Sequence, residues 1–173
     1  MKNVRMINKN GMVMSAQFEM ETPVYINSIE VYTSKEGKTC FELPGYKHKK
    51  EDGEWATNYY AVPASSEAYA ALAKAVDEAI ANGKLSKVSV ATRPNLQGYV
   101  SVQAANMIVS LSYTEDGRVI VPSRKDKNGK YWNYIGISKE QAEAAKAEFQ
   151  AELAKGGATA ADVEDADGAA VVE

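Results

Sequence analysis

The sequence predicts an α+β protein built from two repeated small antiparallel β-sheet domains, each followed by a C-terminal helix, and then a disordered acidic tail. Three observations favour this class. Short runs of β-branched and aromatic residues alternate with turns that contain glycine or asparagine, as in antiparallel sheets. Two alanine-rich segments with helical spacing begin at serines. These features occur twice in the same order, with a period of about 80 residues, which is too long for a solenoid unit.

The first repeat is expected to cover residues 1–84. Strict alternation of apolar and polar side chains marks 12–21 as a half-buried strand, whose methionines fill the core rather than bind a metal. A helix should begin at Ser65 or Ser66 and stop at Asn82–Gly83. Its expected apolar stripe is Tyr69, Leu72, Ala73, Val76 and Ile80. Further strands are expected at 4–7, 24–33, 39–43 and 55–62, with a basic loop at 47–53.

The second repeat is expected to cover residues 85–155. Its helix begins with a capping box, Ser138 to Gln141, and should end near Gly156. Residues that would line one face of this helix are Ala142, Ala145, Phe149 and Leu153. Strands are expected at 86–92, 99–104, 107–113, 119–121 and 131–137, with a turn at 93–98.

The charge of the chain is unevenly distributed. The whole chain has a net charge of −3, and residues 156–173 contain five acidic residues and no cation. Removing those five negative charges leaves +2 for residues 1–155. The acidic segment lacks periodicity and is expected to be disordered. It either makes the protein more soluble or contacts the basic surface or a basic protein partner.

Several classes of chemistry lack their usual residues. Cys40 is the only cysteine, which excludes an intrachain disulfide, fits a reducing cytoplasm and favours a buried inert thiol. His48 is the only histidine and is expected to be exposed, so zinc sites and Ser-His or Cys-His catalysis are not expected. Glycine-rich nucleotide loops, a signal-peptide core and runs of membrane-spanning length are also missing from the sequence. We therefore expect a non-enzymatic protein with no cofactor and no metal.

The candidate site is the stretch 119–137, which reads as strand, basic loop and strand. Pro122 ends the first strand, and Asn128–Gly129 is a strong hairpin signal because both residues tolerate positive φ. The cations of the loop are Arg124, Lys125, Lys127 and Lys130. In the first repeat the loop cations are Lys47, Lys49 and Lys50.

Two functions fit these loops. Cations beside aromatic rings can bind phosphates and stack on bases, the rings being Trp55, Tyr59, Trp132 and Tyr134. Alternatively, the rings are buried and the loops only solubilise a protein-interaction or structural module.

Residues 121–131, VPSRKDKNGKY, resemble the signature of the SpoVG family, also called stage V sporulation protein G or septation protein. That signature is an apolar residue, Pro-Ser, two basic residues, a short polar spacer, Gly-Glu and an aromatic residue. The first repeat is similar at Leu43–Pro44 and Gly53–Trp55, with a loop two residues longer.

This resemblance implies a small β-rich domain with a C-terminal helix, usually homodimeric, that acts in bacteria as a DNA- or RNA-binding regulator. The resemblance implies that nucleic acid is bound by Arg124, Lys125, Lys127 and Lys130. In the first repeat, which matches the signature less closely, it implies the same role for Lys47, Lys49 and Lys50. The family also places basic residues at the helix start. At those positions this chain has Ser-Ser-Glu (65–67) and Ser-Lys-Glu-Gln (138–141), which departs from the family pattern. The tandem arrangement differs from single-domain members too, and it implies a pseudo-dimer within one chain, with further homo-oligomerisation possible.

Overall fold

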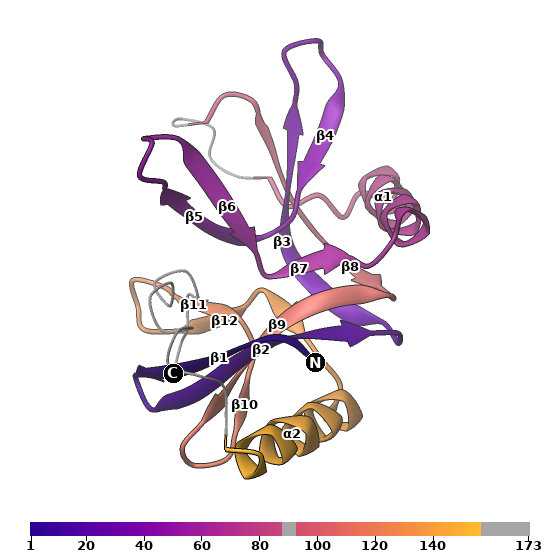
Figure 1. Cartoon of the computed structure of the whole chain (residues 1–173). Coiled ribbons are helices and arrows are strands. Elements are labelled where there is room, and N and C mark those ends of the chain that lie inside the picture. Colours follow the sequence, from indigo (N-terminus) through magenta and orange to yellow (C-terminus); the bar gives the residue numbers. More distant parts are fainter. Residues whose placement is uncertain (88–92, 157–173) are drawn as a thin grey trace.

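The computed structural model describes residues 1–87 and 93–156. The elements run in the order β1 (Lys2–Lys9), β2 (Met12–Met20), β3 (Val24–Thr33), β4 (Thr39–Glu42), β5 (Gly45–Lys49), β6 (Trp55–Tyr59), β7 (Ala61–Pro63), α1 (Ser66–Ala81), β8 (Leu96–Ala104), β9 (Met107–Thr114), β10 (Val119–Ile120), β11 (Ser123–Lys125), β12 (Tyr131–Asn133), β13 (Ile135–Gly136) and α2 (Lys139–Ala154) (Figure 1). The named strands pair antiparallel, so the mixed α+β class is confirmed.

The first sheet is organised around β9. Along one edge, β9 pairs with β2 from Met20↔Met107 to Met12↔Thr114, and β1 extends the sheet beyond β2. Its other edge is shared by two short strands, because β7 pairs with 107–109 and β10 with 112–113. A central strand with both edges paired leaves few backbone donors without partners.

The second sheet repeats this plan around β3. One edge of β3 pairs with β8, from Val24↔Ala104 to Tyr32↔Leu96. The other edge is shared by β13, which pairs with 25–26, and β4, which pairs with 30–33.

Both sheets therefore take strands from both sides of the expected boundary between residues 84 and 85. The reason is burial: each half alone would expose the apolar faces of β2 and β3, or of β8 and β9. Side chains from both halves form one hydrophobic cluster, including Met14, Ile26, Val100 and Leu111. The division into residues 1–84 and 85–155 therefore remains a prediction about the repeat in the sequence. In the structure the two halves are joined through shared sheets.

Matched hydrogen bonds occur at the two proline-ended strands. The amide of Tyr60 donates to the carbonyl of Pro44 at 3.1 Å, and the amide of Tyr134 donates to the carbonyl of Pro122 at 2.8 Å. Each bond closes the base of one hairpin. The two tyrosine rings stack on each other, with centroids 5.1 Å apart, and burial raises the pKa of Tyr60 to about 12.

The same two tyrosines also tie the hairpins to the central strands. The carbonyl of Tyr60 accepts from the amide of Ser110 in β9 at 2.9 Å, and the carbonyl of Tyr134 accepts from the amide of Asn27 in β3 at 2.8 Å. Each hairpin is thus anchored to a strand from the opposite half of the chain, with corresponding bonds in the two halves.

Helix α1 starts at the expected cap, because the Ser65 hydroxyl accepts from the amide of Ala68 at 3.1 Å. It packs beside β8 and β7 (Figure 1). Its buried side chains are Ala68, Leu72, Val76 and Ala79. The expected place of Tyr69 in the buried stripe is wrong: its side chain is 55% exposed and stacks on Phe41. The buried face therefore runs through Ala68, Leu72, Val76 and Ala79, and Tyr69 lies outside it.

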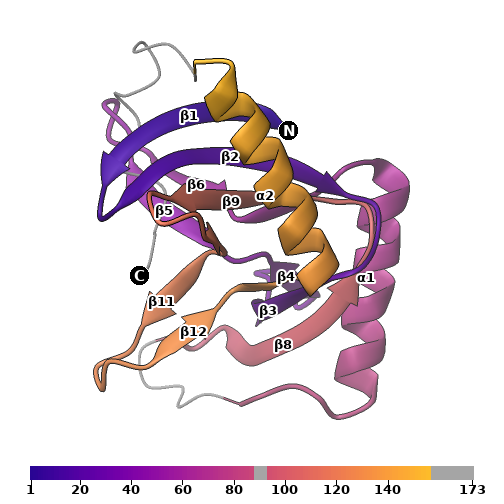
Figure 2. The same cartoon turned by 90° about the horizontal axis from the view of Figure 1, so that it is seen from below.

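Helix α2 lies across β2 and β9 (Figure 2). The predicted capping box at Ser138 and Gln141 is present. Phe149 anchors the helix, because its ring lies 5.0 Å from that of Phe18 and 5.3 Å from that of Tyr113, measured between centroids.

Other local expectations need correction. The strands β5 and β11 extend into segments expected to be loops, and β8 starts at Leu96 inside the expected turn. Cys40 is partly exposed rather than buried, because it lies on β4, whose one strand partner among the described residues is β3. The expected strand at 86–92 and the acidic tail fall largely outside the described residues.

Within the described part of the chain, neither helix is long and apolar enough to cross a membrane.

Candidate nucleic-acid interface

The two basic loops are the ends of two-stranded hairpins, β5–β6 and β11–β12. Both project toward the same side of the molecule, at the left in Figures 1 and 2. We call residues 45–59 the first hairpin and residues 123–133 the second hairpin. Each forms a two-stranded sheet of its own, which does not pair with the larger sheets among the described residues.

The register of the second hairpin sorts its side chains onto two faces. Arg124 pairs with Trp132, and Lys125 pairs with Tyr131. Directly paired residues share a face, and neighbours along a strand point to opposite faces. One face therefore carries a guanidinium beside an indole, and the other carries an ammonium beside a phenol ring.

Asp126 organises the turn of this hairpin. One carboxylate oxygen accepts from the amides of Asn128 at 2.8 Å and Lys130 at 2.9 Å, and the other accepts from the Trp132 indole at 3.2 Å. The Lys130 amide, followed by that indole, holds the pKa of Asp126 below its ordinary value. The carboxylate is thereby committed to the turn and stays charged.

The expected Asn128–Gly129 turn is present in a wider form. Only Gly129 has a positive φ, +82°, and its amide donates to the carbonyl of Asp126 at 3.0 Å. A four-residue turn that ends at a left-handed glycine is typical of a hairpin with a glycine bulge. Gly53 at φ +85° ends the turn of the first hairpin with the matching bond to Lys50.

Two lysines lie over the exposed rings of the second hairpin. Lys125 Nζ is 5.1 Å from the centroid of the Tyr131 ring, and Lys130 Nζ is 4.5 Å from that of Trp132. The indole side chain remains 50% exposed and the phenol side chain 38%. Cations and ring faces are thus held together at the surface.

The second hairpin is strongly cationic. It carries the four predicted cations, all exposed, against the single carboxylate of Asp126. The exposed cations are Arg124, Lys125, Lys127 and Lys130. The structure brings these residues and Trp132 together on one ribbon.

The first hairpin is nearly neutral. Its exposed cations, Lys47, Lys49 and Lys50, are matched in number by the carboxylates of 51–54. Lys50 lies 3.8 Å from Glu54 in an ion pair. Trp55 pairs with Lys49 across the strands and is 72% exposed.

Two further aromatic candidates are engaged elsewhere. The Tyr59 hydroxyl donates to Glu42 at 3.3 Å, and burial followed by this carboxylate raises the pKa of Tyr59. Tyr134 is half-buried in its stack with Tyr60. Tyr134 therefore supports the base of its hairpin, whereas Tyr59 stays 39% exposed with its hydroxyl bonded to Glu42.

His48 is half-buried, which corrects the expectation of an exposed side chain. It stacks on Tyr46 with ring centroids 6.0 Å apart and an interplanar angle of 10°. The alternation of the strand decides this position, because His48 points to the face opposite its two lysine neighbours. Its Nδ1 is buried and has no hydrogen-bond partner among the described residues.

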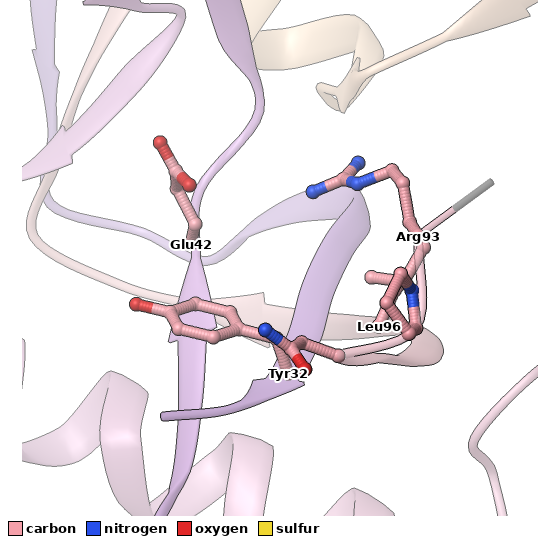
Figure 3. A pocket seen from close by; sticks show the side chains of 6 residues that line it. Tyr32, Glu42, Arg93 and Leu96 are labelled. Carbon is pink, nitrogen blue, oxygen red and sulfur yellow. The ribbon is translucent and has the colours of Figure 1, made fainter. Parts of the chain in front are cut away.

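A polar pocket lies at the end of the second sheet, near the first hairpin, and the sequence did not suggest it. Figure 3 shows Arg93 and Leu96 on one side of the pocket and Glu42 and Tyr32 on the other; Pro94 and Asn95 complete the lining. Both terminal nitrogens of Arg93 donate to Glu30 at 2.8 Å, and this bond lowers the pKa of Glu30.

The pairing of β3 with β4 explains why an arginine is needed at this pocket. Glu30 lies directly opposite Glu42, and like charges in that position destabilise a sheet. The guanidinium of Arg93 neutralises one of them. In the sequence, the sign of a nearby cation was the pair of glutamates Glu30 and Glu42, which face each other in the strands expected at 24–33 and 39–43.

The described residues contain no group of three or more side chains suited to hold a metal ion. The chemistry that this surface offers is ionic contact with phosphates, together with stacking on exposed rings. Comparisons of the chain with protein-family models, curated proteins and solved structures found no match.

Proposed function

We propose that this protein is a nucleic-acid-binding regulator of the SpoVG type, acting in the bacterial cytoplasm and binding DNA or RNA through its basic hairpins. One observation carries the proposal: the second hairpin holds four exposed cations and two exposed rings on one ordered ribbon. Phosphates attract the cations, and exposed rings stack on bases.

The competing interpretation, in which the rings are buried and the loops only solubilise, fits this surface less well. A large aromatic side chain that serves the core loses most of its exposure. Trp132 keeps half of its exposure, and its indole donor is used by Asp126 at the surface. A protein partner for these rings remains the second candidate, and nucleic-acid binding assays separate the two.

The proposal includes a tandem duplication. Residues 1–84 and 85–155 are two copies of one unit, each ending in a helix and fused into an internal pseudo-dimer. The corresponding backbone bonds of Tyr60 and Tyr134 support this. So does the similar pairing of β3 and β9, each of which has one long strand along one edge and two short strands along the other. Each copy contributes one hairpin, and the second copy contributes most of the positive charge.

The test is the salt dependence of binding. Four neutralised phosphates predict a slope of about −3 to −4 for log affinity against log salt. Replacing Arg124 and Lys125 by alanine should reduce the magnitude of that slope by about 2, because each lost phosphate contact removes about 1. The matched control, Lys47→Ala with Lys49→Ala, should change it less, since carboxylates already offset the charge of the first hairpin. Absence of DNA and RNA binding at low salt would refute the proposal.

The acidic segment 156–173 competes with nucleic acid in this proposal, or holds a basic protein partner, because its five carboxylates follow a net positive chain. Deleting residues 158–173 should tighten binding at low salt. The difference should vanish near 1 M salt, where the Debye length is about 3 Å. Fluorescence anisotropy of a labelled oligonucleotide measures the affinity of both proteins. Equal affinities at low salt would rule out the competition, and a lower melting temperature after deletion would show a structural role.

A further inference from the structure

We infer that the second hairpin selects single-stranded nucleic acid, with unpaired bases stacking on Trp132 and Tyr131 while Lys130 and Lys125 move from these rings to phosphates. This inference rests on the proposed function and names the class of nucleic acid that the same surface takes.

The lysines are the first reason. Each ammonium occupies a ring face in the free protein, at 4.5 Å over Trp132 and 5.1 Å over Tyr131. An exposed cation–π contact is weaker than the stacking of a base on the same ring. A base can therefore displace the ammonium, and the freed cation then lies beside the phosphate of the nucleotide that displaced it.

The fixed indole is the second reason. The Trp132 indole donates to Asp126, which also binds two amides of the turn. The ring is thus oriented before a ligand arrives, and less side-chain freedom is lost on binding. Arg124 pairs directly with Trp132 on the same face and supplies a planar cation beside the stacking position.

The faces of bases decide between single and double strands. In a duplex, neighbouring base pairs cover these faces, and the grooves expose only edges and the backbone. A single strand exposes them and bends freely around a narrow ribbon. Rings on opposite faces of one hairpin, as Trp132 and Tyr131 are, can each take a base from a flexible strand.

The first hairpin provides an internal comparison. The rungs that close the two turns correspond, Lys49↔Trp55 in one and Lys125↔Tyr131 in the other. At the next rung, however, the second hairpin has Arg124↔Trp132, and the first has His48↔Ala56. The stacking site beside an arginine is therefore present only in the second hairpin.

The experiment uses the two tryptophans of the chain as separate reporters. The full-length Trp55→Phe variant retains only Trp132, and the Trp132→Phe variant retains only Trp55. Each is titrated with an oligothymidylate or oligouridylate of about 15 nucleotides, near the site size of single-strand binders, and with a duplex of the same length. Tryptophan emission reports stacking, and anisotropy of a labelled strand reports binding independently.

We expect single strands to quench Trp132 emission as they bind, and the duplex to quench it far less. Trp132→Ala should weaken single-strand binding by about 5- to 100-fold with little change in the salt slope, because stacking is not ionic. Trp55→Ala, the comparison on the charge-balanced first hairpin, should weaken it less than Trp132→Ala does, because Trp55 lies across from Lys49 rather than from an arginine. Both residues are exposed, so each variant should retain the circular dichroism spectrum of the parent.

Three results would overturn the inference: bound single strands that leave Trp132 unquenched, equal quenching by the duplex, or quenching carried by Trp55 instead. Each of these leaves nucleic-acid binding itself intact. Anisotropy that shows no binding to either form would overturn the proposed function as well.

Discussion

At the scale of single residues, Asp126 links the turn of the second hairpin to its exposed indole. Its carboxylate is charged when it accepts three hydrogen bonds, so folding lowers its pKa. A lowered pKa means that the stabilisation of the turn is fully present above the ordinary value of 3.8 and is lost as the pH falls through the lower, folded value. The hairpin should therefore keep its shape at neutral pH and loosen only in acid.

A variant separates the contributions to this pKa. In the parent protein, we expect an NMR titration to place the pKa of Asp126 below 3.8. In Trp132→Phe it should rise toward 3.8 without reaching it, because the amide of Lys130 still donates to the carboxylate. Asp116 is the control: its pKa is lowered by Thr114 and Arg118, which the substitution does not touch. An unchanged pKa of Asp126 would show that the indole contact does not persist in solution.

At the scale of elements, the two helices begin alike and are held differently. Serine caps both, and the third helical residue is Ala68 in α1 and Gln141 in α2. Gln141 is buried, its oxygen accepts from the Ser138 amide at 2.8 Å, and its nitrogen donates to the Thr22 hydroxyl at 2.7 Å. This side chain therefore ties α2 to the turn between β2 and β3.

The pair of helices supplies a controlled stability test. Ser65→Ala removes a cap from α1 and should lower the free energy of unfolding by about 1 kcal/mol. Gln141→Ala should cost more, about 1–3 kcal/mol, because it leaves buried polar partners unpaired as well as opening the capping box. Urea denaturation followed by circular dichroism measures both. A smaller loss for Gln141→Ala than for Ser65→Ala would show that water replaces its hydrogen bonds at little cost.

At the scale of the whole molecule, the two halves complete each other. In the intact chain β2 pairs with β9 and β3 pairs with β8. If the halves are copies, β9 occupies the place that β3 of a second copy would take. Fusing the copies then raises the effective concentration of each partner and removes the need for a second chain.

This arrangement predicts the behaviour of a fragment. Residues 1–84 alone should form a homodimer, in which β2 of one copy pairs with β3 of the other, while the full chain is monomeric. Light scattering gives the mass, and a melting temperature that rises with concentration confirms coupled assembly. A folded monomer of residues 1–84 would contradict the need for shared sheets. An unfolded fragment would instead contradict the duplication and leave the observed pairing intact.

The sequence by itself determined the elements whose causes are local. Period-two alternation located β2 and β3, because alternation reports a half-buried strand wherever its partner lies. The serine caps, the capping box and the turns ending at Gly53 and Gly129 depend on residues within a few positions of one another. The cations of the hairpins could be named for the same reason.

Only the tertiary structure decided which strands pair and which side chains become exposed. Alternation does not identify the partner of β2, because β3 and β9 offer similar apolar faces and the choice depends on the burial of the whole chain. The exposure of Trp132, the partial exposure of Cys40 and the bond from Arg93 to Glu30 follow from that choice. The bond from Arg93 to Glu30 joins residues far apart in sequence, where local patterns carry no information and the total apolar surface removed from water selects the arrangement.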